Sequence, residues 1–163
     1  MYRWMIGKLT RLVLARLRAG RPGWLLALMS EDVHFRFPGE HSWAADFHSK
    51  AEVRKWLDRY MQVGLQLHPQ QIVVGGPPWN TVVCTRFSDQ ATDARGEVIY
   101  RNEGVLVDRL VWGRIVEHVS YEDTQRTVAF DSRLTLLPSS ARATVGHQWR
   151  SSMPARRGTA RRR

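Results

Sequence analysis

The order of apolar and polar residues divides the chain into a helical first part and a strand-rich second part. Over residues 4–18 the apolar side chains recur on one arc at about 100° per residue, which predicts an amphipathic helix. An apolar run over 24–29 predicts a second helix, and residues 33–37 (VHFRF) alternate as a half-buried strand does. Ser49 and Glu52 have the spacing of a capping box, which predicts the start of a third helix.

Strand patterns dominate after Gly64. Four strands are expected, over residues 65–74, 79–88, 97–111 and 114–122. Residues 40–48 are expected to be irregular and residues 89–96 (DQATDARG) to form a polar loop, while residues 123–134 can add a short closing helix. Helices followed by antiparallel strands predict an α+β fold, a cone-shaped, curved, mostly antiparallel sheet with three helices on its concave side. Such a cone encloses a pocket.

Composition changes from Pro138 onward, where Ser, Ala, Gly and Arg dominate. A segment of this composition cannot bury enough apolar surface to offset its ordering entropy. We therefore expect one folded domain over residues 1–134 and a disordered basic tail over residues 135–163.

The net charge of +10 is concentrated at the two ends of the chain. Residues 1–22 and 134–163 contain no acidic residue, and the body between them is net acidic. A basic tail alone gives weak, salt-sensitive attraction to polyanions, so we expect no specific nucleic-acid partner.

The remaining composition predicts a cytoplasmic protein without a cofactor. Cys84 is the single cysteine and cannot form an internal disulfide. Basic residues interrupt the apolar amino-terminal segment, so it does not resemble a signal peptide, and no window approaches a transmembrane segment. We expect no metal site, because metal-ligand spacing is absent among His34, His41, His48 and His68.

Several short motifs follow one another in an informative order. They are Ala19-Gly20, the run from Leu25 to Met29, Glu31-Asp32-Val33, Pro38-Gly39, the run from Ala51 to Trp56, and the run from Gly113 to His118 (GRIVEH). Over about residues 6–130 this order resembles the SnoaL-like branch of the nuclear transport factor 2-like superfamily, which includes ketosteroid isomerase, limonene epoxide hydrolase and polyketide cyclases. The resemblance implies a cone-shaped α+β barrel, a homodimer formed through the sheet, and a pocket for a small apolar ligand.

The resemblance also implies catalytic candidates, which are Asp123, Glu40 and His118. His118 matches the histidine of cyclase-like members, although Ser120 replaces the acid that follows it there. Tyr121 and Asp123 match the end of the last strand in the epoxide hydrolase branch, with Arg86 as the partner arginine, but Ser88 replaces the second acid of that trio. Asp89 is expected to point away from Arg86.

Alternation along the last strand leaves two interpretations open. Tyr121 and Asp123 share one face, and His118 lies on the other face with Ser120 and Glu122. Either Tyr121 and Asp123 form a pocket pair, or His118 faces inward and Asp123 caps the closing helix.

Ligand-binding candidates come from four predicted elements. Tyr100 and Asn102 on the long strand can orient a ligand through hydrogen bonds. The full set is Tyr121, Tyr100, Asn102, Arg86, Trp56 and Tyr60. The resemblance implies an isomerase, cyclase or epoxide hydrolase acting on an apolar, oxygen-bearing ligand, with a non-catalytic ligand-binding or dimerisation module as the alternative. The enzyme hypothesis requires at least two ionisable side chains facing one enclosed cavity.

Overall fold

A computed structural model describes residues 1–93 and 95–136, so the expected tail lies from residue 137 on outside the described residues. The helices are α1 (Tyr2–Arg18), α2 (Gly23–Leu28), α3 (Lys50–Gln62) and α4 (Thr124–Leu136). The strands are β1 (Met29–Phe37), β2 (Ala45–Phe47), β3 (Gln66–Gly75), β4 (Thr81–Thr92), β5 (Val98–Val111) and β6 (Arg114–Glu122). Within the described part of the chain, no helix is both long and apolar enough to cross a membrane.

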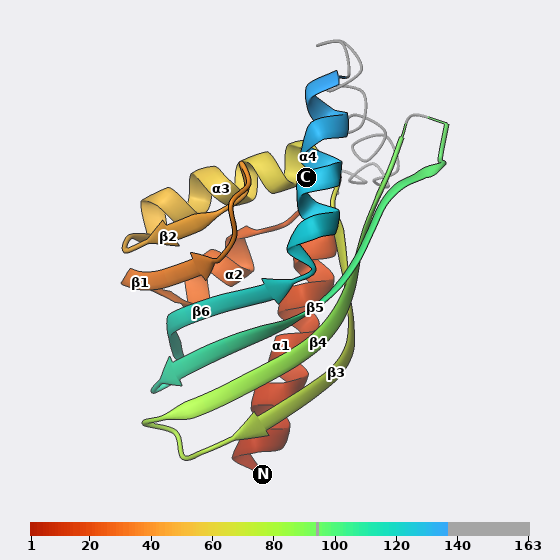
Figure 1. Ribbon diagram of the computed structural model, residues 1–163. Coiled ribbons are helices and arrows are strands. Elements are labelled where there is room, and N and C mark those ends of the chain that lie inside the picture. The colour runs from red at the N-terminus through yellow and green to blue at the C-terminus, as the bar shows by residue number, and fades with distance from the viewer. Residues whose placement is uncertain (94, 137–163) are drawn as a thin grey trace, which may run out of the picture.

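All six strands form one sheet in the order β2-β1-β6-β5-β4-β3. Every neighbouring pair is antiparallel except β1 and β6, which run parallel. The long strands β3, β4 and β5 curve together, and α3 and α4 lie above β1 and β6 in the view (Figure 1). The predicted α+β fold with a curved, mostly antiparallel sheet is therefore confirmed.

The first helix forms where the apolar periodicity predicts it, and the third helix begins where the capping box predicts it. The buried face of α1 consists of Ile6, Val13, Leu14 and Leu17, and this helix packs mainly against β3. At the start of α3, the Ser49 hydroxyl accepts a hydrogen bond from the Glu52 backbone N–H at 3.4 Å, which confirms the predicted cap. Val53, Leu57 and Tyr60 form the buried face of α3.

Three element boundaries differ from the expectation. Strand β1 begins at Met29 rather than Val33, because Met29 has an extended backbone and pairs with Ile115 of β6. Residues 40–48 contain the short strand β2, which pairs with β1. The polar residues Asp89–Thr92 continue β4 because they pair with β5 over that length. Tertiary pairing thus extends the sheet into segments that look like loops.

A β-bulge decides which side chains of β6 face inward. Leu110 of β5 pairs with Ile115, whereas Arg109 pairs with Glu117, so Val116 is the extra residue. Ile115 is buried before the bulge. Beyond it, the inward face carries His118, Ser120 and Glu122.

Candidate functional site

A mainly aromatic cavity opens between the sheet, α3 and α4. The enclosed space is only about 20 Å³, close to the room that one water molecule needs. The lining residues are Phe37, Trp43, Trp56, Tyr60, Leu65, Asp89, Tyr100, Glu122, Thr127 and Phe130. Two carboxyl groups and two phenol groups therefore border one mainly apolar space.

Asp89 projects into this cavity from β4 and is only 4% exposed. The Tyr60 hydroxyl, from α3, donates to the two carboxylate oxygens of Asp89 at 3.3 and 3.4 Å. Burial raises the pKa of Asp89 well above its ordinary value, and the negative charge of Glu122 adds to this effect. Backbone hydrogen bonds and the bond from Tyr60 oppose the increase. Asp89 therefore tends to keep its proton.

Glu122, at the end of β6, has more hydrogen-bond donors around it than Asp89. Its Oε2 accepts from the Tyr100 hydroxyl and from Asn102 Nδ2, both at 3.3 Å, and its Oε1 accepts from the Ser120 hydroxyl at 3.2 Å. Burial raises the pKa of Glu122 to about 7, and these hydrogen bonds limit the increase. Glu122 can therefore gain or lose a proton near neutral pH.

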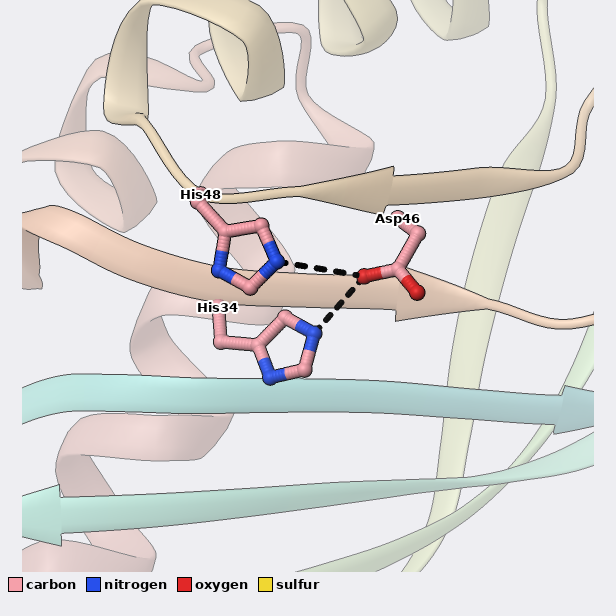
Figure 2. Close-up of side chains that lie close together, drawn as sticks. All are labelled: His34, Asp46 and His48. Carbon is pink, nitrogen blue, oxygen red and sulfur yellow. Dashed lines mark hydrogen bonds and ion pairs between the residues drawn. The ribbon is translucent and has the colours of Figure 1, made fainter.

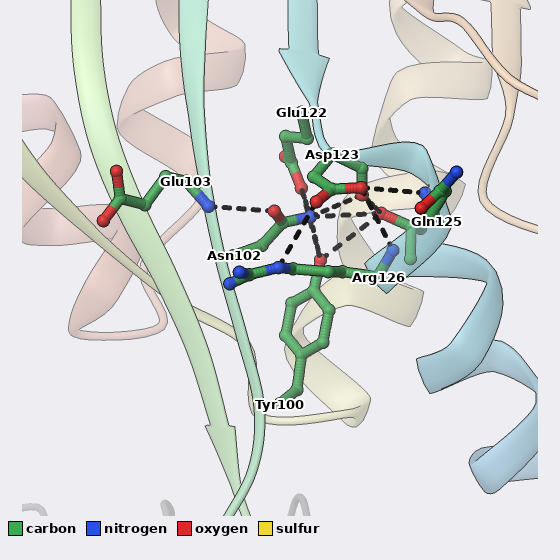
Figure 3. Close-up of polar contacts among 8 residues, drawn as sticks. Tyr100, Asn102, Glu103, Glu122, Asp123, Gln125 and Arg126 are labelled. Atoms are coloured by element: carbon green, nitrogen blue, oxygen red, sulfur yellow. Dashed lines mark hydrogen bonds and ion pairs between the residues drawn. The ribbon is translucent and has the colours of Figure 1, made fainter.

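Asn102 holds this cluster together from the middle of β5 (Figure 3). Its Oδ1 accepts from the Glu103 backbone N–H at 2.9 Å, which directs Nδ2 towards the cavity side. Oxygen acceptors lie at 2.9 to 3.3 Å from Nδ2 on Tyr100, Glu122, Asp123 and Thr127. An amide nitrogen carries only two hydrogens, so these acceptors must share them. If a bound ligand takes one of these acceptors, the amide hydrogens of Asn102 can still bond to the others.

The two tyrosines of the cavity remain protonated donors at neutral pH. Burial raises the pKa of Tyr60 well above its ordinary value, and the nearby charge of Asp89 reinforces the increase. Burial likewise raises the pKa of Tyr100, with a contribution from the charge of Glu122. Both phenols can thus donate hydrogen bonds to a carboxylate or to a ligand oxygen.

The predicted ligand-binding residues divide between the cavity and the surface. Trp56, Tyr60 and Tyr100 line the cavity, and the buried Asn102 contacts it through its network. The side chain of Arg86 is 58% exposed and forms an ion pair with Glu103 at 3.7 Å. Alternation places Arg86 on the outer face of β4, opposite to the face of Asp89.

The predicted pocket pair of Tyr121 and Asp123 does not face the cavity. Tyr121 is 53% exposed, because the β6 bulge turns Glu122 inward instead. Asp123 caps α4, where its Oδ1 accepts from the backbone N–H groups of Gln125 at 3.0 Å and Arg126 at 3.3 Å. The arrangement is thus the alternative in which His118 points inward and Asp123 caps the closing helix.

The other two catalytic candidates also lie away from the cavity lining. Glu40 is exposed in the loop after β1. His118 Nδ1 lies 2.6 Å from Asp108 Oδ1 of β5, and its ring stacks on Phe35 at a centroid distance of 4.7 Å. Both members of this pair are buried, and Asp108 is the acidic partner of His118 in this fold. The catalytic role of His118 stays a prediction.

Sequence reasoning missed the two carboxyl groups that the cavity contains. Asp89 was assigned to a polar loop, although β4 buries every second residue, including Val83, Thr85 and Phe87 before it. This alternation, continued past Ser88, is the signal that places Asp89 inside. Glu122 lies on the same predicted face of the last strand as His118, and both side chains point to the inner face of the sheet.

Comparisons with known proteins agree with this architecture. The family model described as a SnoaL-like domain matches residues 10–118. The match thus covers α3 and Asp89 but ends before Glu122. No curated protein matches this chain in sequence.

Solved structures with this fold share little sequence with the chain. PrhC from Penicillium brasilianum is 14% identical with a TM-score of 0.67, covering 91% of this chain and 98% of that one. An NTF2-like protein of unknown function from Burkholderia pseudomallei is 17% identical with a TM-score of 0.65, covering 77% and 95%. IdmH from Streptomyces antibioticus, described as a proposed polyketide cyclase, is 17% identical with a TM-score of 0.60, covering 76% and 96%. At these identities the likeness shows the fold alone.

Proposed function

Because this chain belongs to the SnoaL-like domain family, we propose that its cavity is an active site for proton transfer on a small, apolar, oxygen-bearing molecule. The observation that carries the proposal is the carboxyl pair of Asp89 and Glu122 in one aromatic cavity. Burial raises the pKa of both groups, and the negative charge of Glu122 raises the pKa of Asp89 further. Two such carboxyls can act together as one acid and one base near neutral pH.

The surroundings of the two carboxyls assign their roles. Three hydrogen-bond donors stabilise the carboxylate form of Glu122, which makes it the base. Asp89 is more deeply buried and retains its proton, so together with Tyr60 it is the proposed acid. Glu122 would remove a proton from a carbon next to a ligand carbonyl, while Asp89 hydrogen-bonds to the carbonyl oxygen and stabilises the resulting enolate. Returning the proton at another carbon, or attack of the enolate carbon on a second carbonyl, gives isomerisation or cyclisation.

The ligand class follows from the cavity lining. Phe37, Trp56 and Phe130 offer aromatic surface to a flat, apolar molecule. The buried indole N–H of Trp43, another lining residue, has no hydrogen-bond partner among the described residues. A ligand oxygen is a suitable acceptor for it. The fold shared with IdmH, described as a proposed polyketide cyclase, supports an oxygen-rich polyketide-like ligand.

The proposal can be tested with 2-tetralone, a small bicyclic ketone whose α-hydrogens exchange with deuterium once the enolate forms. Proton NMR in D₂O would follow this exchange with and without the full chain. We expect the protein to accelerate exchange and Glu122→Gln to lower that acceleration by about 100-fold or more, the usual contribution of a general base.

Glu103→Gln is the matched control for this experiment, because Glu103 is an exposed glutamate of the neighbouring strand. It should exchange the ketone as fast as the wild-type protein does. Absence of acceleration with wild-type protein, or full acceleration with Glu122→Gln, would contradict the proposed role of the cavity.

A non-catalytic binding module is the second candidate, and the size of the cavity favours it. The enclosed volume of about 20 Å³ lies far below the roughly 300–1,000 Å³ of ligand pockets. Under this alternative, 2-tetralone would bind and shift cavity NMR signals without exchanging its α-hydrogens faster.

We also propose a homodimer formed through the outer face of the sheet. Val73 of β3 is 55% exposed and Val82 of β4 is 40% exposed, so this face offers apolar surface to a second copy. Light scattering should give twice the mass of the chain, and Val82→Glu should shift it towards the monomer. A wild-type monomer at micromolar concentration would contradict the dimer.

A further inference from the structure

Three potential metal ligands converge at the β2 edge of the sheet, away from the cavity (Figure 2). His34 lies on β1, Asp46 on β2, and His48 directly after β2. Antiparallel pairing places Phe35 opposite Phe47, and these two rings stack 6.1 Å apart. Because side chains alternate along a strand, the residues next to them point to the opposite, outer face.

The distances within this His34–Asp46–His48 cluster are short. His34 Nε2 lies 2.7 Å from Asp46 Oδ1, and His48 Nε2 lies 3.6 Å from the same oxygen. The two imidazole rings stack at a centroid distance of 4.3 Å. One ligand atom from each residue lies within 4.8 Å of the others. The strand pairing thus builds a compact set of two nitrogen donors and one oxygen donor.

We propose that the His34–Asp46–His48 cluster binds a divalent first-row transition-metal ion, with Zn²⁺ as its representative. Two histidines and one carboxylate form a ligand set that zinc proteins use, with solvent free to supply the remaining ligand. Around one tetrahedral zinc ion, ligand atoms lie about 3.4 Å apart, given bonds of about 2.0–2.1 Å. The His48–Asp46 distance already fits, and the His34–Asp46 contact must open by roughly 0.7 Å.

Exposure allows this adjustment without disturbing the core. The side chains of Asp46 and His48 are 64% and 73% exposed, and that of His34 is 34% exposed. Rotating an exposed side chain has a small energetic cost. Arg36 Nε lies 3.9 Å from Asp46 Oδ2, so Oδ1 is the oxygen left for the ion. The positive charge of Arg36 should weaken, though not prevent, metal binding.

The nitrogen donors also predict which ions the cluster prefers. Imidazole suits zinc, nickel and copper, whereas Mg²⁺ and Ca²⁺ prefer oxygen ligands. A surface cluster that attracts cations only by charge would not discriminate in this way. Selectivity for Zn²⁺ over Mg²⁺ is therefore part of the proposal.

Isothermal titration of the full chain with Zn²⁺, after treatment with a chelator, tests the proposal. We expect saturable binding that weakens at least about tenfold in each of His34→Asn, Asp46→Asn and His48→Ala, because even residues that only support metal ligands contribute that much. His68→Ala is the matched control, since it removes one histidine from β3, far from the cluster along the sheet, and should bind as the wild type does. Mg²⁺ at the same concentration should give no comparable binding.

The proposal fails if the wild type does not bind Zn²⁺, if the cluster variants bind it as tightly as the wild type, or if Mg²⁺ binds equally well. Circular dichroism without metal should show that the exposed variants remain folded. The absorption spectrum of added Co²⁺ gives a second readout, because coordination by the cluster should produce d–d bands that Asp46→Asn weakens. Exchange of 2-tetralone should not depend on this cluster, so the two proposals fail independently.

Discussion

At the scale of single residues, the two cavity carboxyl groups differ in what surrounds them. Glu122 has donors on both of its oxygens, whereas Asp89 has long contacts to Tyr60 and backbone partners in a more buried place. Burial disfavours the charged form of both groups, and the hydrogen bonds to Glu122 offset part of this penalty by stabilising its carboxylate. This difference in environment, rather than residue type, is the basis for proposing Glu122 as the base and Asp89 as the acid.

The raised pKa of Glu122 makes the stability of the protein depend on pH. Burial raises this pKa from 4.5 to about 7, so the folded state holds the proton more tightly than the unfolded chain does. The stability that protonated Glu122 contributes to the folded state is fully present below about pH 4.5 and is lost as the pH rises through about 7. Ionised Glu122 therefore costs the folded state about 3 kcal/mol at pH 8.

Glu122→Gln removes this pH-dependent cost. Between pH 4.5 and pH 8, the free energy of unfolding of Glu122→Gln should therefore rise relative to that of the wild type, by up to about 3 kcal/mol. Urea unfolding at the two pH values measures this difference. Glu103→Gln, on the exposed face, should leave the pH dependence as it is in the wild type. An equal effect of Glu122→Gln at both pH values would show that Glu122 ionises normally.

At the scale of elements, the junction between β6 and α4 decides which acid enters the cavity. One extra residue at Val116 shifts the pairing with β5, and the following residues then place Glu122 inside and Tyr121 outside. Asp123 follows immediately and caps α4, which supplies Thr127 and Phe130 to the cavity lining. The bulge and the cap thus position Glu122 and part of the cavity lining together.

Asp123 provides a test that separates capping from catalysis. Asp123→Ala should lower the free energy of unfolding by about 1 kcal/mol, whereas Asp123→Asn should cost little, because Asn also caps helices well. Asp123→Asn should also keep the 2-tetralone exchange of the wild type. Loss of exchange in this stable variant would make Asp123 a catalytic residue after all.

The same junction shows why the sequence predicted the fold better than the site. Periodicity predicts the amphipathic helix α1 and the half-buried strand β1 because local patterns determine them. A bulge leaves no local pattern, so the orientation of Tyr121 and Glu122 could not be decided from alternation alone. Likewise, the polar run containing Asp89 belongs to a strand only because β5 pairs with it.

At the scale of the whole molecule, the cavity exists because distant segments enclose it. Asp89 comes from β4, Glu122 from β6, Tyr60 from α3 and Phe130 from α4. The raised pKa values are therefore a property of the complete fold rather than of a short motif. The His34–Asp46–His48 cluster arises in the same way, from the pairing of β1 with β2, and its sequence spacing alone did not indicate it.

The most direct test of the carboxyl pair is a carbon-13 NMR titration of the side-chain carboxyls, with Asp89→Asn and Glu122→Gln used to assign the signals. We predict that Glu122 titrates with a pKa of about 7, that Asp89 titrates well above its ordinary range, and that Glu122→Gln lowers the pKa of Asp89 by removing a neighbouring charge. If both groups lose their protons below about pH 5, as solvated carboxyls do, the cavity lacks the proposed acid–base pair and the account is contradicted.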